Sequence, residues 1–153
     1  MITTYRIVKA RYAATAFDGE GARVSGGRWS SRGTAMVYTS ESAALAALEM
    51  LVHFQRGAVL PAYVVIPCSF DQSLVSNLNP SILPRNWRSY PAPRKQQLIG
   101  DDWVKRGSSA VLRVPSVIIA SESNYLLNPR HADFASIRIG SRQRFKLDLR
   151  LIH

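Results

Sequence analysis

The segments of this chain that are apolar enough to be buried are short and strand-like, and they do not alternate regularly with helices. Thr4–Val8, Ala35–Thr39 and Val59–Pro67 are rich in β-branched and aromatic residues, a composition that predicts strands. Arg94–Arg106 predicts one or two short helices ending at Gly107. Successive parallel strands would need a crossover helix between them. The order of the segments therefore predicts an α+β fold with a largely antiparallel or mixed β-sheet and a few helices.

The second half of the chain adds further strands and a long irregular segment. Ala110–Val114 and Val117–Ala120 are apolar runs on either side of a Pro-Ser pair, and apolar and charged side chains alternate over Phe145–Leu151, as in a half-buried strand. Asn77–Pro93 holds four prolines and shows no period, which predicts an irregular surface segment. The length matches one ordinary domain, so a single domain over residues 1–153 is expected.

A glycine-rich loop and one helix stand out in the first third of the chain. Gly19–Gly33 holds five glycines and predicts a loop in which the backbone can approach a ligand closely. Ser40 is the expected N-cap of the following helix, which is predicted to run to about Arg56 and to stop at Gly57. Apolar side chains at helical spacing predict its buried face: Leu45, Leu48 and Val52.

Glu49 lies beside that apolar face and not opposite it. On a helix it is rotated only about 40° from Leu45. Burying a carboxylate without a partner costs several kcal/mol. An acid in this position is therefore either a boundary residue that reaches solvent or an arginine, or a catalytic acid that lines a cleft. The helical pattern leaves both interpretations open.

Three other side chains have a similar pair of interpretations. Arg28 follows two glycines and is either solvated or placed beside a ligand. Tyr38 lies on a predicted strand, where packing is a more common role than catalysis. Arg6 lies inside the first strand and is either exposed at an edge or lines a site. His53 and His131 lack the spacing of a metal-binding pair, so no metal site is expected.

The net charge of +10, from 20 basic and 10 acidic residues, raises the question of an anionic partner. Nucleic acid is one candidate, but the arginines are spread from Arg6 to Arg150, and the sequence contains no zinc-finger spacing or RNA-binding signature. A phosphate-bearing small molecule or an acidic protein would use the same charge. Ser-His-Asp order, P-loop and dinucleotide-binding glycine motifs are also missing, so several large enzyme classes lose support.

The cysteine content and hydropathy bear on the compartment. Cys68 is the single cysteine, and a lone cysteine is usually a small core residue. No apolar run approaches the roughly 20 residues that cross a bilayer. The sequence therefore predicts a cytoplasmic protein that is not bound to a membrane.

A set of short motifs, taken in chain order, resembles one known family and covers essentially the whole chain. The motifs are Tyr5-Arg6-Ile7, Gly26-Gly27-Arg28-Trp29, Gly33, Tyr38, the helix end Leu48–His53, Gly100-Asp101-Asp102-Trp103, Val114-Pro115-Ser116 and Asn124–Pro129. Together they resemble the RES domain, which is named for an arginine, a glutamate and a serine. Where the family commonly shows an Asn-Ser-Pro-Gly run, this sequence has Ser30-Ser31-Arg32-Gly33. That departure leaves the loop shape and the substrate preference open.

The resemblance implies an ADP-ribosyltransferase-like fold and the role of toxin in an Xre/RES type II toxin–antitoxin pair. It further implies that NAD is a substrate, degraded by hydrolysis or phosphorolysis at its nicotinamide–ribose bond, so no cofactor is expected. Carried over to matching positions, Glu49 would stabilise the charge that develops on the ribose. Arg28 and Arg6 would hold the pyrophosphate, Tyr38 would stack on the nicotinamide, and Ser116 would bind the substrate or orient Glu49.

The implied catalytic residues are thus Glu49, Arg28 and Tyr38, with Arg6 and Ser116 in substrate binding. The implied partner is an Xre-like antitoxin that blocks the active site. A homodimer is possible, and direct nucleic-acid binding is not expected. Two alternatives stay open: a protein ADP-ribosyltransferase, and a basic nucleic-acid-binding protein without enzymatic activity. Three further polar residues are interpreted as structural, tying down the loop before Pro129: Asn124, Asn128 and His131.

Overall fold

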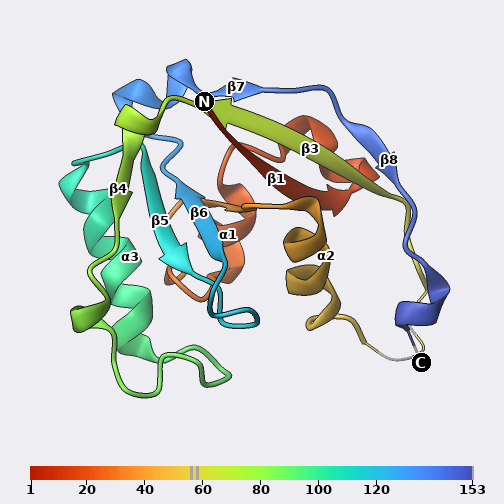
Figure 1. The fold of residues 1–153 in the computed structure, drawn as a ribbon, viewed down its shortest axis with the longest axis horizontal. Coiled ribbons are helices and arrows are strands. Elements are labelled where there is room, and N and C mark those ends of the chain that lie inside the picture. The colour runs from red at the N-terminus through yellow and green to blue at the C-terminus, as the bar shows by residue number, and fades with distance from the viewer. Residues whose placement is uncertain (56, 58, 153) are drawn as a thin grey trace.

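The computed structural model describes residues 1–55, 57 and 59–152, and a mostly antiparallel sheet runs through them (Figure 1). Its strands are β1 (Ile2–Lys9), β2 (Val37–Ser40), β3 (Tyr63–Phe70), β4 (Val75–Asn77), β5 (Val111–Pro115), β6 (Ser123–Leu127), β7 (Arg138–Ile139) and β8 (Gln143–Phe145). Their order is β4-β5-β6-β2-β1-β3-β7, with β8 also pairing with β3, and β4–β5 is parallel. The predicted α+β fold with a largely antiparallel or mixed sheet is confirmed.

Helices are few in the described residues and lie beside the sheet. They are α1 (Glu20–Ser25), α2 (Ala43–Leu51) and α3 (Arg94–Arg106), with 3-10 turns at Ala10–Thr15, Gln72–Leu74, Pro80–Ile82, Ala132–Ser136 and Leu149–Leu151. Figure 1 shows α3 beside β4 and β5, and α2 below the paired strands β1 and β3. The range predicted for α3 is confirmed as one helix. It ends, as predicted, at Gly107, which adopts a left-handed conformation with φ of 61°.

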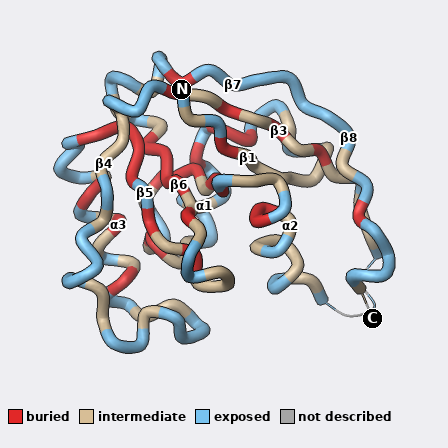
Figure 2. The backbone as a smooth tube through the Cα atoms, in the orientation of Figure 1, coloured by how far each residue is buried: buried red, intermediate tan, exposed pale blue. Residues whose placement is uncertain are grey.

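Buried side chains form two clusters on the two faces of the sheet. Because neighbouring strand residues point to opposite faces, Val111 and Leu127 join one cluster while Leu112 and Leu126 join the other. The first cluster contains Cys68, so the prediction of a core cysteine is confirmed. The second contains two tryptophans, Trp29 from the glycine loop and Trp103 from α3. Figure 2 shows the buried backbone concentrated in the central strands, with β7 and β8 exposed along the outer edge.

The helix that carries Glu49 is shorter and less buried than predicted. Its N-cap is Ser42, whose side chain accepts a hydrogen bond from Leu45 N at 3.0 Å, because Ser40 is still part of β2. The helix ends at Leu51, and the predicted end at Arg56 lies outside the described residues.

The predicted buried face of this helix holds only in part. Leu45 is buried, but Leu48 and Val52 are 37% and 60% exposed, so their assignment to the buried face was wrong. The reason is that α2 packs on β1 and β2 from one side and has a cleft along the other.

Three predicted loop or strand boundaries were also wrong. Gly19–Gly33 contains a short helix, α1, which begins directly after Gly19, where φ is 78°. The central strand starts at Tyr63, and Val59 is 92% exposed. The run Val117–Ala120 forms turns, and the strand after it is β6 (Ser123–Leu127), which pairs with both β2 and β5.

The predicted C-terminal strand Phe145–Leu151 is absent from the described structure. β8 ends at Phe145, and a 3-10 turn follows at Leu149–Leu151, where the Asp148 side chain accepts a hydrogen bond from Arg150 N. Leu147 is buried, but Leu149 and Leu151 are exposed. Alternation of apolar and charged residues therefore did not indicate a strand here. None of the described helices is long and apolar enough to cross a membrane.

Candidate functional site

A cleft of about 700 Å³ lies where β1, β2, α2 and the glycine loop meet. That volume is within the roughly 300–1,000 Å³ typical of ligand pockets. Four residues singled out from the sequence line it together: Arg6 from β1, Arg28 from the glycine loop, Tyr38 from β2 and Glu49 from α2. The fifth, Ser116, is fully buried behind Glu49 and reaches the cleft through that side chain.

Glu49 is held by two neutral side chains, and these three residues form the Glu49 cluster. Its Oε1 accepts hydrogen bonds of 2.8 Å from Ser116 Oγ and of 2.8 Å from Asn124 Nδ2. Both donors are uncharged side chains, so the hydrogen bonds of this cluster orient the carboxylate without forming an ion pair. Among the described residues, Glu49 Oε2 has no hydrogen-bond donor, which leaves this oxygen for a ligand in the cleft.

The hydroxyl of Ser116 has a defined orientation. Its oxygen accepts hydrogen bonds from Ile118 N and Ile119 N, each at 3.1 Å. A hydroxyl has one proton to donate and two lone pairs that accept. With the lone pairs used by the main chain, the proton is directed to Glu49. Ser116 therefore fixes the orientation of the Glu49 carboxylate.

Tyr38 is held by its hydroxyl from the glycine loop. Its oxygen accepts a hydrogen bond from Trp29 N at 3.0 Å and shares one of 2.7 Å with Ser30 Oγ. Burial raises the pKa of Tyr38 to about 12, so the hydroxyl is neutral at physiological pH. A Cβ on Gly27 would lie 2.5 Å from this hydroxyl oxygen. Glycine at position 27 is therefore required for the loop to pass so close to the ring.

Arg28 connects the glycine loop to the irregular segment across the cleft. Its Nη1 donates to the carbonyl oxygens of Trp87 at 3.0 Å and Ser89 at 2.9 Å. Partial burial lowers the pKa of Arg28, and the nearby Glu49 carboxylate opposes that shift. An arginine remains protonated in either case. The guanidinium is thus a permanent positive charge beside the carboxylate, with Nε and Nη2 still able to bind an anion.

Arg6 does not lie exposed at a sheet edge, and its guanidinium donates hydrogen bonds to main-chain carbonyl oxygens. Nε donates to Ala16 O at 2.7 Å and Nη1 to Tyr38 O at 3.0 Å. Burial lowers the pKa of Arg6, and Asp18 opposes this effect. Arg6 therefore braces the strand that carries Tyr38, while its side chain also contributes to the wall of the cleft.

α3 fixes the glycine loop through three contacts. Gln97 Nε2 donates to Gly27 O at 3.0 Å, and Asp101 accepts hydrogen bonds from the main chain and the hydroxyl of Ser31. At Gly100 the helix backbone touches the loop, since a Cβ there would lie 1.6 Å from Trp29 O. Ser30, which stands where the family pattern has asparagine, thus holds Tyr38, whereas Ser31, which matches the pattern, holds α3.

Asn124 and Tyr90 are cleft residues that the sequence analysis did not select. Asn124 was interpreted as structural, but it lines the cleft and contacts Glu49. The signal that identifies it is the pairing of Asn124 with Ser40 in the sheet, and this register could not be inferred because β6 was not predicted. Tyr90 lay in a proline-rich segment with no period to place its side chain.

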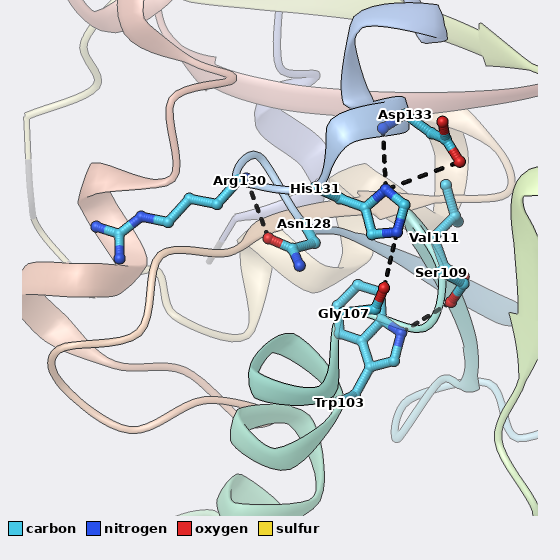
Figure 3. Close-up of polar contacts among 8 residues, drawn as sticks. All are labelled: Trp103, Gly107, Ser109, Val111, Asn128, Arg130, His131 and Asp133. Atoms are coloured by element: carbon cyan, nitrogen blue, oxygen red, sulfur yellow. Dashed lines mark hydrogen bonds and ion pairs between the residues drawn. The ribbon is translucent and has the colours of Figure 1, made fainter.

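Asn128 and His131 have the structural role expected of them (Figure 3). His131 Nδ1 accepts a hydrogen bond from Asp133 N at 3.0 Å, so the proton is on Nε2, which lies 2.9 Å from Gly107 O. Asn128 Oδ1 accepts from Arg130 N at 3.0 Å. These two residues and their main-chain partners are the His131 cluster. Across residues 1–55, 57 and 59–152, His, Cys, Asp and Glu side chains form no group that could hold a metal ion.

Comparison with known proteins places these features in a wider group. A family model described as the RES domain matches residues 3–148. "Toxin Res" of Yersinia enterocolitica is 43% identical over 130 residues, covering 85% of this chain and 86% of that protein. The "Prs ADP-ribosylating toxin" of a Sphingobium species is 38% identical over 144 residues, covering 92% of this chain and 89% of that protein.

A solved structure provides an independent comparison of the fold. The crystal structure of the MbcT–MbcA toxin–antitoxin complex of M. tuberculosis contains a chain that matches with a TM-score of 0.76 at 19% identity. The match covers 94% of this chain and 84% of that chain. At this identity the likeness concerns the fold alone, and it confirms the predicted α+β fold.

Proposed function

The chain belongs to the RES domain family, and from that premise we propose that it is the toxin of a toxin–antitoxin pair that cleaves the nicotinamide–ribose bond of NAD. The support for the toxin role is the name "Toxin Res" of the Yersinia relative. The support for the chemistry is the composition of the cleft, described below. NAD enters as a substrate, and an Xre-like antitoxin is the proposed inhibitor.

The observation that carries the proposal is the Glu49 cluster at the wall of the cleft. When the nicotinamide–ribose bond breaks, the bonding electrons leave with the nicotinamide nitrogen and the ribosyl carbon becomes cationic, as in glycoside cleavage. A carboxylate fixed before the reaction stabilises such a charge without reorganisation. Ser116 and Asn124 hold Oε1 of Glu49, and Oε2 is available to the ribose.

The other cleft residues fit roles in binding the rest of the substrate. Arg28 has Nε and Nη2 for bidentate contact with the pyrophosphate. Arg6 uses Nε and Nη1 to brace the main chain, so its proposed contact to phosphate would come through Nη2. The fixed ring of Tyr38 is the proposed surface for the nicotinamide.

The proposal is tested by nicotinamide release from NAD by the purified chain, compared with Glu49→Gln. The substitution removes the charge and keeps the shape, and we expect a loss of at least about 100-fold in kcat. Glu122→Gln makes the same change in charge outside the cleft and should retain full activity. The proposal would be contradicted if Glu49→Gln released nicotinamide as fast as the native chain, or if the folded native chain released none.

A second candidate, a protein ADP-ribosyltransferase, is favoured by the name of the Sphingobium relative. The bond that breaks is the same, and the two functions differ in the acceptor oxygen or nitrogen that adds to the ribose. Labelled NAD incubated with a cell extract distinguishes them. Free ADP-ribose, or its phosphorylated form when phosphate is present, indicates NAD degradation, whereas a labelled protein band with little bulk NAD loss indicates transfer to protein.

A further inference from the structure

The irregular segment 84–93 is fixed over one side of the cleft by arginines from two directions. From the glycine loop, Arg28 donates to the carbonyl oxygens of Trp87 and Ser89. From the segment itself, Arg88 Nη2 donates to Val117 O at 3.2 Å on the neighbouring rim. Such bonds give a defined position to a segment that has no helix or strand to hold it. The residue placed by them is Tyr90.

Tyr90 is a large aromatic side chain that the core does not use. It is 79% exposed and lines the same cleft as Glu49. Its ring lies across from His53, with 6.3 Å between the ring centroids and 52° between the planes. His53 also lines the cleft and follows Glu49 by four residues, in the turn just beyond α2. The two rings therefore stand together at the mouth of the cleft, one from each wall.

The position of Arg28 relates these rings to the carboxylate of Glu49. Arg28 lines the same cleft as Glu49 and Tyr90, and it donates to the carbonyl oxygen of Ser89, the residue before Tyr90. If Arg28 binds the pyrophosphate at the centre of a dinucleotide, Glu49 and Tyr38 are available to one end of the molecule and Tyr90 is available to the other. A dinucleotide carries a planar heterocycle at each end, and aromatic rings bind such heterocycles by stacking.

We propose that Tyr90, backed by His53, is a stacking platform for one heterocycle of the dinucleotide substrate. This inference rests on the proposed function, since it names a subsite of the same cleft. The adenine and the nicotinamide offer the same chemistry to the platform, and half-molecules of the substrate separate them. ADP-ribose carries the adenine end, and nicotinamide mononucleotide carries the nicotinamide end.

The test measures the binding of each half-molecule by calorimetry to the full chain carrying Glu49→Gln, in which turnover is blocked. Tyr90→Ala should weaken binding of one half-molecule roughly tenfold, the effect expected for loss of a stacking ring, and should leave the other within about twofold. Tyr90→Phe keeps the ring and should bind both normally. Tyr12→Ala is the matched control, because Tyr12 is also an exposed tyrosine but is not among the residues that line this cleft.

Loss confined to ADP-ribose supports the platform and assigns it to the adenine. Loss confined to nicotinamide mononucleotide supports it and assigns it to the nicotinamide in place of Tyr38. Unchanged binding of both by Tyr90→Ala overturns the proposal, as does equal weakening of both, which indicates a structural contact between the rims. Failure of native Glu49-containing protein to bind either half-molecule also overturns it. Normal half-molecule binding without NAD cleavage would contradict the proposed function and leave the platform standing.

Discussion

The Glu49 cluster and the His131 cluster are both networks of polar side chains, but their hydrogen bonds end differently. In the His131 cluster the side chains bond to main-chain groups, namely Asp133 N, Gly107 O and Arg130 N. In the Glu49 cluster the carboxylate is held by two other side chains at the wall of a cleft. The first arrangement joins segments of the backbone, whereas the second orients a charge and leaves one of its atoms available.

The largest effect that would sharpen this comparison is expected from Asn124→Leu, which removes a donor to Glu49 at similar volume. If the cluster orients the carboxylate for reaction, kcat for NAD cleavage should fall about 100-fold, the range found when one preorganised donor is removed. KM should change little. Nicotinamide release measures both constants, and a fall in the melting temperature large enough to account for the lost activity would contradict a positioning role.

The corresponding change in the other cluster is His131→Ala. It removes the partner of Gly107 O and of Asp133 N, and because both residues are exposed, water can replace the lost side chain. A hydrogen bond of this kind contributes about 0.5–1.5 kcal/mol, so we expect the free energy of unfolding, measured with urea, to fall by about 1 kcal/mol. The activity per folded molecule should be unchanged, and a selective loss of kcat would break the distinction between the clusters.

Ser116 combines the two kinds of contact, because it bonds to Glu49 and to the main chain at Ile118 and Ile119. Ser116→Ala should therefore lower kcat by about tenfold and the free energy of unfolding by about 1 kcal/mol. Both values come from one variant, by assay and by urea denaturation. A change in only one of them would assign Ser116 to a single role.

Tyr38 gives the smallest expected effect, which appears only in alkaline solution. Its pKa is raised to about 12 in the folded protein, while an unfolded tyrosine ionises near 10. The stability it contributes is present below pH 10 and is lost as the pH rises from 10 towards 12. Between pH 10 and 11 the free energy of unfolding of the native chain should fall by about 1 kcal/mol more than that of Tyr38→Phe. An equal loss of stability in both proteins would show that a group other than Tyr38 is responsible for the pH dependence.

Much of the fold was predictable because its signals are local. α3 has a glycine at its C-terminal end, and the strands β1 and β2 are apolar enough to be recognised individually. The C-terminal alternation misled for a physical reason: Asp148 forms a local turn with Arg150, and that turn competes with strand pairing. β6 was missed because polar residues begin it, although it becomes a central strand.

The sequence pattern marked two residues of the candidate site as unusual but did not assign their roles. Glu49 lies beside apolar residues of its helix and Arg28 follows two glycines, and the resemblance to the RES domain selected both as site residues. Asn124 gave no such signal, because its contact with Glu49 depends on the register between β2 and β6. Tyr90 depends on hydrogen bonds to the main chain of an irregular segment, and these have no sequence pattern.

The contact between Gly100 and the carbonyl of Trp29 has a consequence for genetics. If expression of this chain arrests growth, the colonies that survive will carry mutations that inactivate it. Any codon change that gives position 100 a side chain forces α3 away from the glycine loop and so displaces Arg28. We therefore expect survivors to carry mutations at Gly100 as well as at Glu49, so a map of escape mutations would include positions that hold the fold together as well as positions that act in the reaction.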